Sequence, residues 1–203
     1  TSPDQIAIAP GTLEKVWLDK GRRYFHYKMD KPILNFYSFQ SARYEVRHDR
    51  WRDVTIDIYY HPAHDFNLDR IVRGVKASLE YYSANFSPYQ HKVVRVIEFP
   101  RYETFAQAYP GTIPYSENIG FIAKVDDKDP KDIDYPFHVT AHEMAHSWFQ
   151  HVLASNESKH GWMDEGFTSF LEDLGMNEIA DKKVENPFTG AYAGYFSMVN
   201  SGK

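Results

Sequence analysis

The sequence predicts an α+β fold, and two observations lead to it. Residues 23–60 contain alternating and aromatic-rich runs that are typical of strands. After these runs the pattern changes to apolar residues at helical spacing, then two short strand-like runs, then two more helical segments. The resulting order of strand, helix, strand, strand, helix and helix suits an α+β core.

The first part of the chain is expected to be all β. The predicted strands cover residues 24–29, 33–46 and 54–61, where aromatic and β-branched residues are frequent. A boundary is expected near His61-Pro62, where the pattern changes. We therefore predict that residues 1–60 are the C-terminal part of a β-sheet domain and that residues 61–203 form a second domain.

The second part begins with a helix. Apolar residues at helical spacing predict a helix over residues 68–86, with Asn67 or Asp65 as its cap. A short strand follows over residues 92–100 and ends at a proline. The run Ile-Gly-Phe-Ile-Ala-Lys-Val at residues 119–125 predicts a further strand.

Two helices complete the pattern. The first is expected over residues 134–153, with Asp134 near the cap and Pro136 in the first turn. The second is expected from residue 162, with Gly175 as its C-terminal stop. Its apolar stripe consists of Phe167, Phe170, Leu171 and Leu174.

Composition excludes several classes of function. The chain has 203 residues, a formal net charge of −5 and scattered Lys and Arg, which argues against nucleic acid or an anionic membrane as partner. The absence of cysteine excludes disulfides, thiolate metal ligands and a cysteine nucleophile. No run is apolar enough to span a bilayer and the first residues lack a signal-peptide pattern, so we expect a soluble segment whose compartment is not encoded.

The pattern His142-Glu143-x-x-His146, followed after eighteen further residues by Glu165, predicts a metal site with a general base. Residues four apart on a helix lie on one face, so His142 and His146 can bind the same ion. Glu165 would be the third ligand, from the next helix. Three such ligands are typical of catalytic zinc, and Glu143 would act as the base on a metal-activated water. We expect one Zn²⁺ per chain.

His138 offers an alternative register, because it continues the row of histidines at a spacing of four. No glutamate follows His138, so we favour the register that begins at His142 and interpret His138 as an outer or surface histidine. A further alternative is that the two motif histidines and Glu165 are unrelated surface or core residues.

The segments His-Glu-Met-Ala-His-Ser-Trp-Phe-Gln and Trp-Met-Asp-Glu-Gly-Phe resemble the gluzincin metallopeptidases of the aminopeptidase N family, in which the zinc motif has the same spacing. Asp164 stands where that family usually has Asn. Upstream, Glu117 and Asn118 are similar to the end of the family's G-x-M-E-N motif, whereas the three residues before them differ. The part up to about residue 150 is similar to peptidase domains fused to bacterial ABC-transporter permeases, and the part after it to stand-alone bacterial aminopeptidases.

The resemblance implies roles for further residues. Glu117 and Asn118 would bind the free amino group of the substrate peptide, and Glu172 would orient one of the zinc-binding histidines. Residues 61–203 would form a thermolysin-like catalytic domain, preceded by the last part of an all-β domain. The tyrosine that steadies the oxyanion in relatives would lie beyond Lys203, so we expect the catalytic domain to be truncated at its C-terminus.

The sequence therefore predicts a zinc aminopeptidase that hydrolyses N-terminal residues from peptides with a free amino terminus. A thermolysin-like endopeptidase would use the same metal site without anchoring the amine. A zinc-binding but catalytically silent scaffold domain is the third hypothesis. The chain carries no membrane segment in its sequence, although a longer parent protein could be membrane-associated.

Overall fold

A computed structural model of the chain describes residues 1–129 and 131–179. Its centre is a four-stranded sheet in the order β5 (Glu45–Trp51), β6 (Val54–Tyr60), β7 (Val93–Phe99) and β8 (Thr112–Ser116). β5 is antiparallel to β6, whereas β6, β7 and β8 run parallel to one another. The combination of sheet and helices confirms the predicted mixed α and β class.

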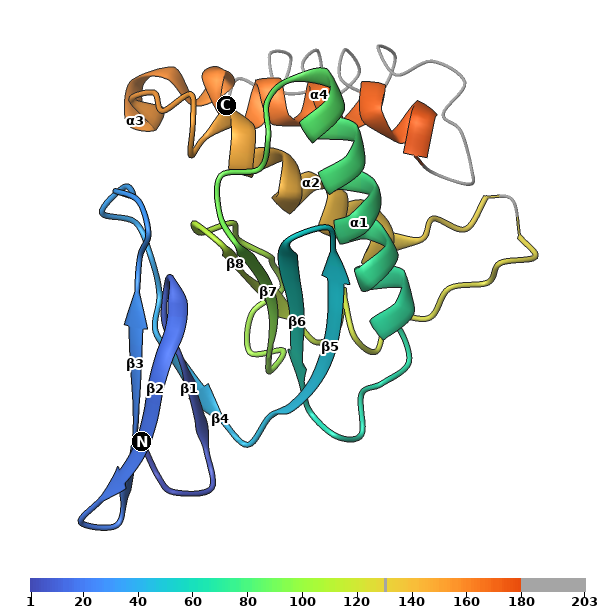
Figure 1. Ribbon diagram of the computed structural model, residues 1–203. Coiled ribbons are helices and arrows are strands. Elements are labelled where there is room, and N and C mark those ends of the chain that lie inside the picture. Colours follow the sequence, from blue (N-terminus) through green and yellow to red (C-terminus); the bar gives the residue numbers. More distant parts are fainter. Residues whose placement is uncertain (130, 180–203) are drawn as a thin grey trace.

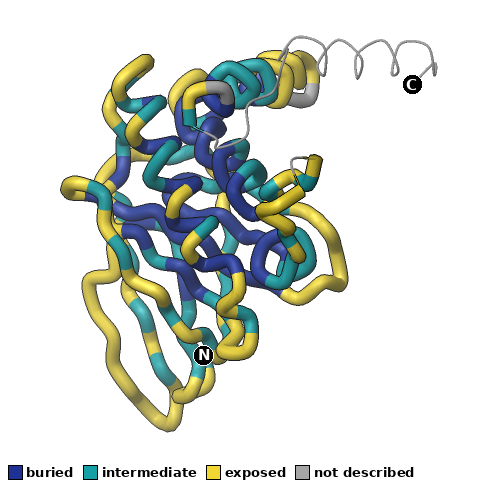
Figure 2. Tube along the Cα trace, turned by 90° about the vertical axis from the view of Figure 1, so that its right-hand side faces the viewer, coloured by how far each residue is buried: buried dark blue, intermediate teal, exposed yellow. Residues whose placement is uncertain are grey.

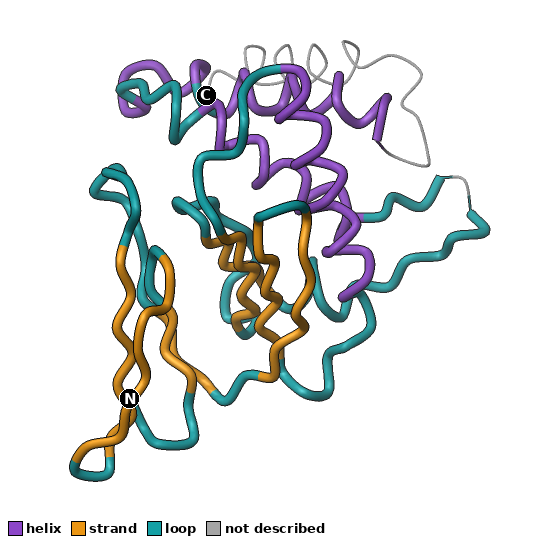
Figure 3. Tube along the Cα trace, viewed as in Figure 1, coloured by secondary structure: helices purple, strands orange, loops and turns teal. Residues whose placement is uncertain are grey.

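The helices gather on one side of this sheet (Figure 1; Figure 3). They are α1 (Leu68–Asn85), α2 (Tyr135–Phe149) and α4 (Glu165–Ile179), with the short α3 (Glu157–His160) and the 3₁₀ turn η1 (Gly161–Met163) between α2 and α4. Within the described residues, none of these helices combines the length and apolar character needed to cross a membrane.

The main core lies between the sheet and the helices. α1 contributes Ile71, Val75 and Leu79, which recur at a spacing of four and are fully buried. α2 adds Met144 and Trp148 to the same cluster. α4 packs against both α1 and α2, so the metal motif of α2 faces a second helix.

The N-terminal strands cover the opposite face of the sheet. β1 (Ile6–Ile8) pairs with β4 (Gln40–Ala42), and β2 (Thr12–Asp19) pairs with β3 (Arg22–Lys28). Successive residues of a strand point to opposite faces of the sheet. Tyr59 therefore points away from the helices and packs with Ile8 and Ile97. Figure 2 shows the β2–β3 hairpin as largely exposed and the central sheet as buried.

The change from one sheet to the next falls between β4 and β5. The four-stranded sheet therefore extends across the boundary that the sequence placed near His61-Pro62, because β6 pairs in parallel with β7 over residues 55–59 and 93–97. The division into residues 1–60 and 61–203 as two domains of a longer protein stays a prediction.

Three strand predictions differ from the structure. Residues 119–125 are not a strand but a turn and the loop that follows it, and Phe121 there is fully buried. The apolar residues of this segment therefore reflect core packing. The strand in this part of the chain is β8, which ends directly before Glu117. Residues 33–39 are likewise not a strand. Of the β2–β3 hairpin, the sequence predicted β3 but not β2. Lys20 and Gly21 form the turn between them, with φ of 47° and 73°. Because β2 is exposed on both faces, its sequence does not alternate between apolar and polar residues.

The helix ends also show which residues act as caps. Asp134 caps α2 by accepting a hydrogen bond from the Phe137 N–H at 3.1 Å, and Pro136 lies in the first turn, as predicted. α4 continues through Gly175, so the predicted stop there is wrong. Gly175 is buried against α1, where a Cβ atom would lie 3.1 Å from the Tyr81 ring, and its lack of a side chain permits that close packing.

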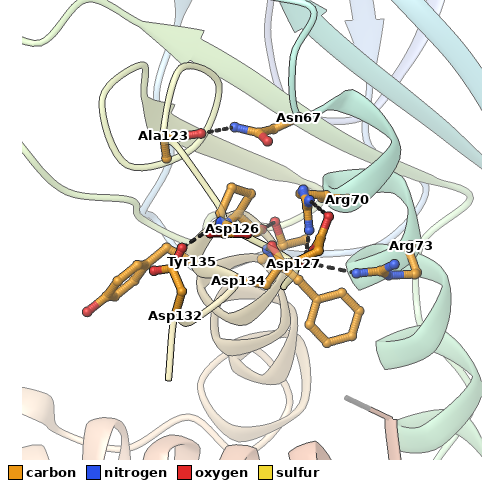
Figure 4. A network of polar contacts seen from close by, with 12 residues as sticks. Asn67, Arg70, Arg73, Ala123, Asp126, Asp127, Asp132, Asp134 and Tyr135 are labelled. Carbon is orange, nitrogen blue, oxygen red and sulfur yellow. Dashed lines mark hydrogen bonds and ion pairs between the residues drawn. The ribbon is translucent and has the colours of Figure 1, made fainter. Parts of the chain in front are cut away.

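Asn67 stands at the N-cap position of α1, but its side chain makes no cap hydrogen bond. Its amide instead donates to the backbone oxygens of the loop that leads to α2, at 2.8–3.1 Å (Figure 4). In the same network Arg70 bonds Asp127 at 2.6 Å and Asp134 at 2.7 Å, and Arg73 bonds Asp134 at 2.9 Å. These contacts fix the start of α2 against α1.

Candidate metal centre

His142 and His146 of α2 converge with Glu165, the first residue of α4. One ligand atom from each lies within 4.8 Å of the others. Glu165 Oε2 is 3.4 Å from His142 Nε2 and 3.8 Å from His146 Nε2. Both imidazoles therefore direct the same ring nitrogen toward one carboxylate oxygen.

The other ring nitrogens are engaged on the far side. His142 Nδ1 lies 2.8 Å from Glu172 Oε2. His146 Nδ1 lies 2.8 Å from Asp164 Oδ1 and 3.2 Å from Thr168 Oγ1. An acceptor at Nδ1 favours the tautomer with its proton there, which leaves the Nε2 lone pair free for a metal ion.

This donor set fits zinc. Two imidazole nitrogens and a carboxylate oxygen form bonds of about 2.0–2.2 Å to a tetrahedral Zn²⁺, which places ligand atoms roughly 3.4 Å apart. The observed separations are close to that value. His146 is almost fully buried, whereas the Glu165 side chain is 66 % exposed, so the group is open on one side.

Glu143 lies between the two histidines and is buried. One of its carboxylate oxygens, Oε2, is buried and has no hydrogen-bond partner among the described residues. Burial raises the pKa of Glu143 to about 7; the charge of His142 opposes this rise, and Glu165 and Glu172 reinforce it. A carboxylate with a pKa near 7 can both accept and return a proton at neutral pH.

The two histidines have opposite pKa shifts. Burial lowers the pKa of His142, but hydrogen bonds to Glu165 and Glu172 outweigh burial and raise it to about 10. Burial, together with the charge of His142, lowers the pKa of His146 to about 4. Without a metal ion and at neutral pH, His142 is therefore charged and His146 is neutral, and Glu165 and Glu172 stabilise the charge of His142.

The structure does not bring Glu117 and Asn118 to this group. Glu117 lies with His64 and Glu98, and Arg101 Nε is 3.4 Å from its Oε1. The Asn118 side chain bonds Ser116 Oγ and Thr104 Oγ1 instead. The amine-binding role that the resemblance implies for these two residues stays a prediction.

His138 is not part of the metal group either. Glu165 of α4 completes the register that begins at His142 and not the alternative register that begins at His138. The contacts of Asp164 and Thr168 with His146 were missed by the sequence analysis. A signal was available, because Asp164 immediately precedes the predicted ligand Glu165. The oxyanion tyrosine, expected beyond Lys203, lies outside the described residues.

A family model described as the peptidase family M1 domain matches residues 67–199. Glutamyl aminopeptidase from Bos taurus is 26 % identical over 126 residues, covering 62 % of this chain and 13 % of that protein. Aminopeptidase A from Gloydius brevicauda is 24 % identical over 184 residues, covering 88 % and 19 %.

A leukotriene A-4 hydrolase homolog from Botryotinia fuckeliana is 31 % identical over 104 residues, covering 49 % of this chain and 15 % of that protein. The chain thus spans less than a fifth of the length of these curated relatives.

Proposed function

The chain belongs to peptidase family M1, and we propose that it contributes the zinc-binding core of an aminopeptidase that hydrolyses N-terminal residues from peptides. The family is zinc-dependent, and its substrates are peptides. The observation that carries the proposal is the convergence of His142, His146 and Glu165 with both Nδ1 atoms engaged on the outer side.

Each residue of the metal centre would have its own role in the reaction. His142, His146 and Glu165 would hold one Zn²⁺, which supplies a Lewis acid for the peptide carbonyl and for a water molecule. Glu143 would accept the proton of the attacking water and return it to the leaving amine. Glu172 and Asp164 would keep the imidazole rings oriented, which preserves the metal geometry between turnovers.

The finer features of fold and origin belong to the same proposal. We infer a thermolysin-like arrangement from the parallel strands, the motif helix α2 and the ligand helix α4. The bacterial type, the fusion to a transporter permease and the count of one zinc are expectations from the sequence.

An assay on the chain with fluorogenic amino-acid amides tests the proposal. We expect turnover that chelation removes, that zinc restores, and that Glu143→Gln reduces by at least about 10²-fold while zinc stays bound. Equal turnover in Glu143→Gln would contradict the role of Glu143. Zinc binding without any turnover would instead support the silent scaffold domain.

An endopeptidase is the second candidate, because the same metal site could act without a group that anchors the substrate amine. An aminopeptidase also needs a carboxylate that binds the cationic amine, and that role of Glu117 is a prediction. Matched peptides with free and acetylated amino termini separate the two reactions. A preference for the free terminus that Glu117→Ala abolishes supports the aminopeptidase, whereas equal internal cleavage of both peptides supports the endopeptidase.

A further inference from the structure

A cavity of about 460 Å³ lies at the carboxyl ends of the parallel strands β6, β7 and β8. One wall comes from the segments that follow these strands and includes Pro62, Pro100 and Glu117. The facing wall comes from the N-terminal part of the chain and includes Ala42 and Tyr44. Ligands of open sheets bind at the carboxyl ends of parallel strands, and ligand pockets have volumes of about 300–1,000 Å³. The cavity therefore has the place and the size of a binding site.

The Glu117 carboxylate lies at this cavity without a short hydrogen bond. Its Oε1 is 3.4 Å from Arg101 Nε and its Oε2 is 3.8 Å from His64 Nδ1. Both distances exceed the roughly 2.7–2.9 Å of a charge-assisted hydrogen bond. Arg101 is also a weak competitor, because its side chain is 68 % exposed and solvent screens its charge. Glu117 can therefore accept a closer bond from a cationic ligand group.

The backbone holds Glu117 in place. Its N–H donates to the Phe99 carbonyl at 2.9 Å, and its own carbonyl accepts from the Phe121 N–H at 3.0 Å. Phe121 is fully buried in the core. A group that is already fixed before binding loses little conformational entropy when the ligand arrives.

The other charged groups of the cavity wall have partners. Glu98 accepts a hydrogen bond from the His61 backbone N–H at 2.5 Å and a second contact from His64 Nδ1. Arg43 is paired with Asp4. These charges are compensated within the protein, so neither Glu98 nor Arg43 requires a charged group of the ligand.

The remaining wall is apolar. The Tyr44 hydroxyl donates to the Glu98 carbonyl at 3.1 Å, and burial raises the pKa of Tyr44 to about 12, so the group stays neutral and engaged. Its ring lines the cavity together with Ala42, Pro62 and Pro100. An apolar wall beside a carboxylate suits a ligand that carries an ammonium group next to a large apolar side chain.

We propose that this cavity binds the amino-terminal residue of the substrate peptide, that Glu117 accepts its ammonium group, and that Ala42 and Tyr44 select a large apolar side chain. The inference rests on the proposed peptidase function and names its substrate class, peptides that begin with a residue such as Phe or Leu. An acidic first residue would face Glu98 and Glu117, which repel it. A small first residue would leave the apolar wall uncovered.

Peptide binding to the metal-free chain tests the proposal, because no metal ligand lines the cavity. Calorimetry with Phe-Ala-Ala, Ala-Ala-Ala and acetylated Phe-Ala-Ala compares the contributions of the side chain and of the amine. We expect Phe-Ala-Ala to bind at least about tenfold more tightly than either of the other two peptides.

Two variants separate the contributions. Ala42→Leu fills part of the cavity and should reduce the preference for Phe-Ala-Ala over Ala-Ala-Ala by about tenfold. Glu117→Gln should weaken both free peptides alike and leave their ratio unchanged. Ala63→Leu is the matched control, because Ala63 is exposed in the loop after β6 and does not line the cavity.

Thermal unfolding verifies that each variant is folded, and Ala42→Val, a change suited to a strand, replaces Ala42→Leu if the latter is not. Equal affinity for the three peptides, or an equal loss for both free peptides in the Ala42 variant, would overturn the proposal. Peptide binding without hydrolysis would contradict only the proposed function. Hydrolysis without the expected binding preference would contradict only this inference.

Discussion

Glu143 should make the metal-free protein less stable at alkaline pH, and Glu143→Gln should remove this effect. The group has a folded pKa of about 7 against an ordinary value of 4.5. A pKa that folding raises contributes stability that is fully present below the unfolded pKa, and this contribution is lost as the pH rises through the folded pKa. The window is therefore between about pH 4.5 and pH 7.

The size of the effect follows from the shift. At about 1.4 kcal/mol per pKa unit, the raised pKa of Glu143 costs roughly 3 kcal/mol of stability at pH 8 and roughly 1 kcal/mol at pH 5, relative to acid pH. Glutamine has nearly the same shape and no charge. Glu143→Gln should therefore increase the free energy of unfolding by about 2 kcal/mol more at pH 8 than at pH 5.

Urea unfolding of the chelator-treated protein at both pH values measures this difference, and Asp69→Asn on exposed α1 surface serves as control. Saturating zinc should abolish the gain, because a bound cation stabilises the carboxylate. A gain that is the same at pH 5 and pH 8 would refute the reasoning that Glu143 is held near neutrality by burial and neighbouring carboxylates.

Three further predictions concern the groups around the histidines. Glu172→Gln should weaken zinc binding by about 10-fold to 100-fold, while Glu178→Gln, exposed on the same helix, should not change it in a competition titration. Asp164→Asn should keep most of the zinc affinity, because an amide of the same shape keeps a polar oxygen close to His146 Nδ1, whereas Asp164→Ala should lose about tenfold; a larger loss for Asn than for Ala would contradict the contact. Zinc binding at pH 8.5 should release about two protons, one from His142 with its pKa of about 10 and one from the zinc-bound water, and calorimetry in buffers of different ionisation enthalpy counts them; release of only one proton would contradict the raised pKa of His142.

The local parts of the site were predictable from the sequence. The spacing of His142 and His146 depends only on helix geometry, and the cap and proline at the start of α2 are local signals as well. The family resemblance implied the contact of Glu172 with a zinc-binding histidine, and Glu172 lies two turns after Glu165 on the same helix. Short-range periodicity therefore predicted both helices that supply the metal ligands.

The parts that depend on distant pairing were not predictable in the same way. The place of Glu117 is decided by the parallel pairing of β8 with β7, and nothing near Glu117 in the sequence encodes that register. Gly175 looked like a helix stop, but its role is the close packing of α4 on α1, which requires the tertiary contact with Tyr81. The same holds for Asn67, whose amide bonds a loop more than fifty residues away.

The central claim is that α2 and α4 together hold one zinc ion through His142, His146 and Glu165. Elemental mass spectrometry of dialysed protein, beside Glu165→Ala and the control Glu178→Ala, tests it most directly. The account predicts that Glu165→Ala retains one equivalent of zinc fewer than the wild type and that the control retains the same number. Equal zinc in all three proteins would show that the three side chains do not act as one site.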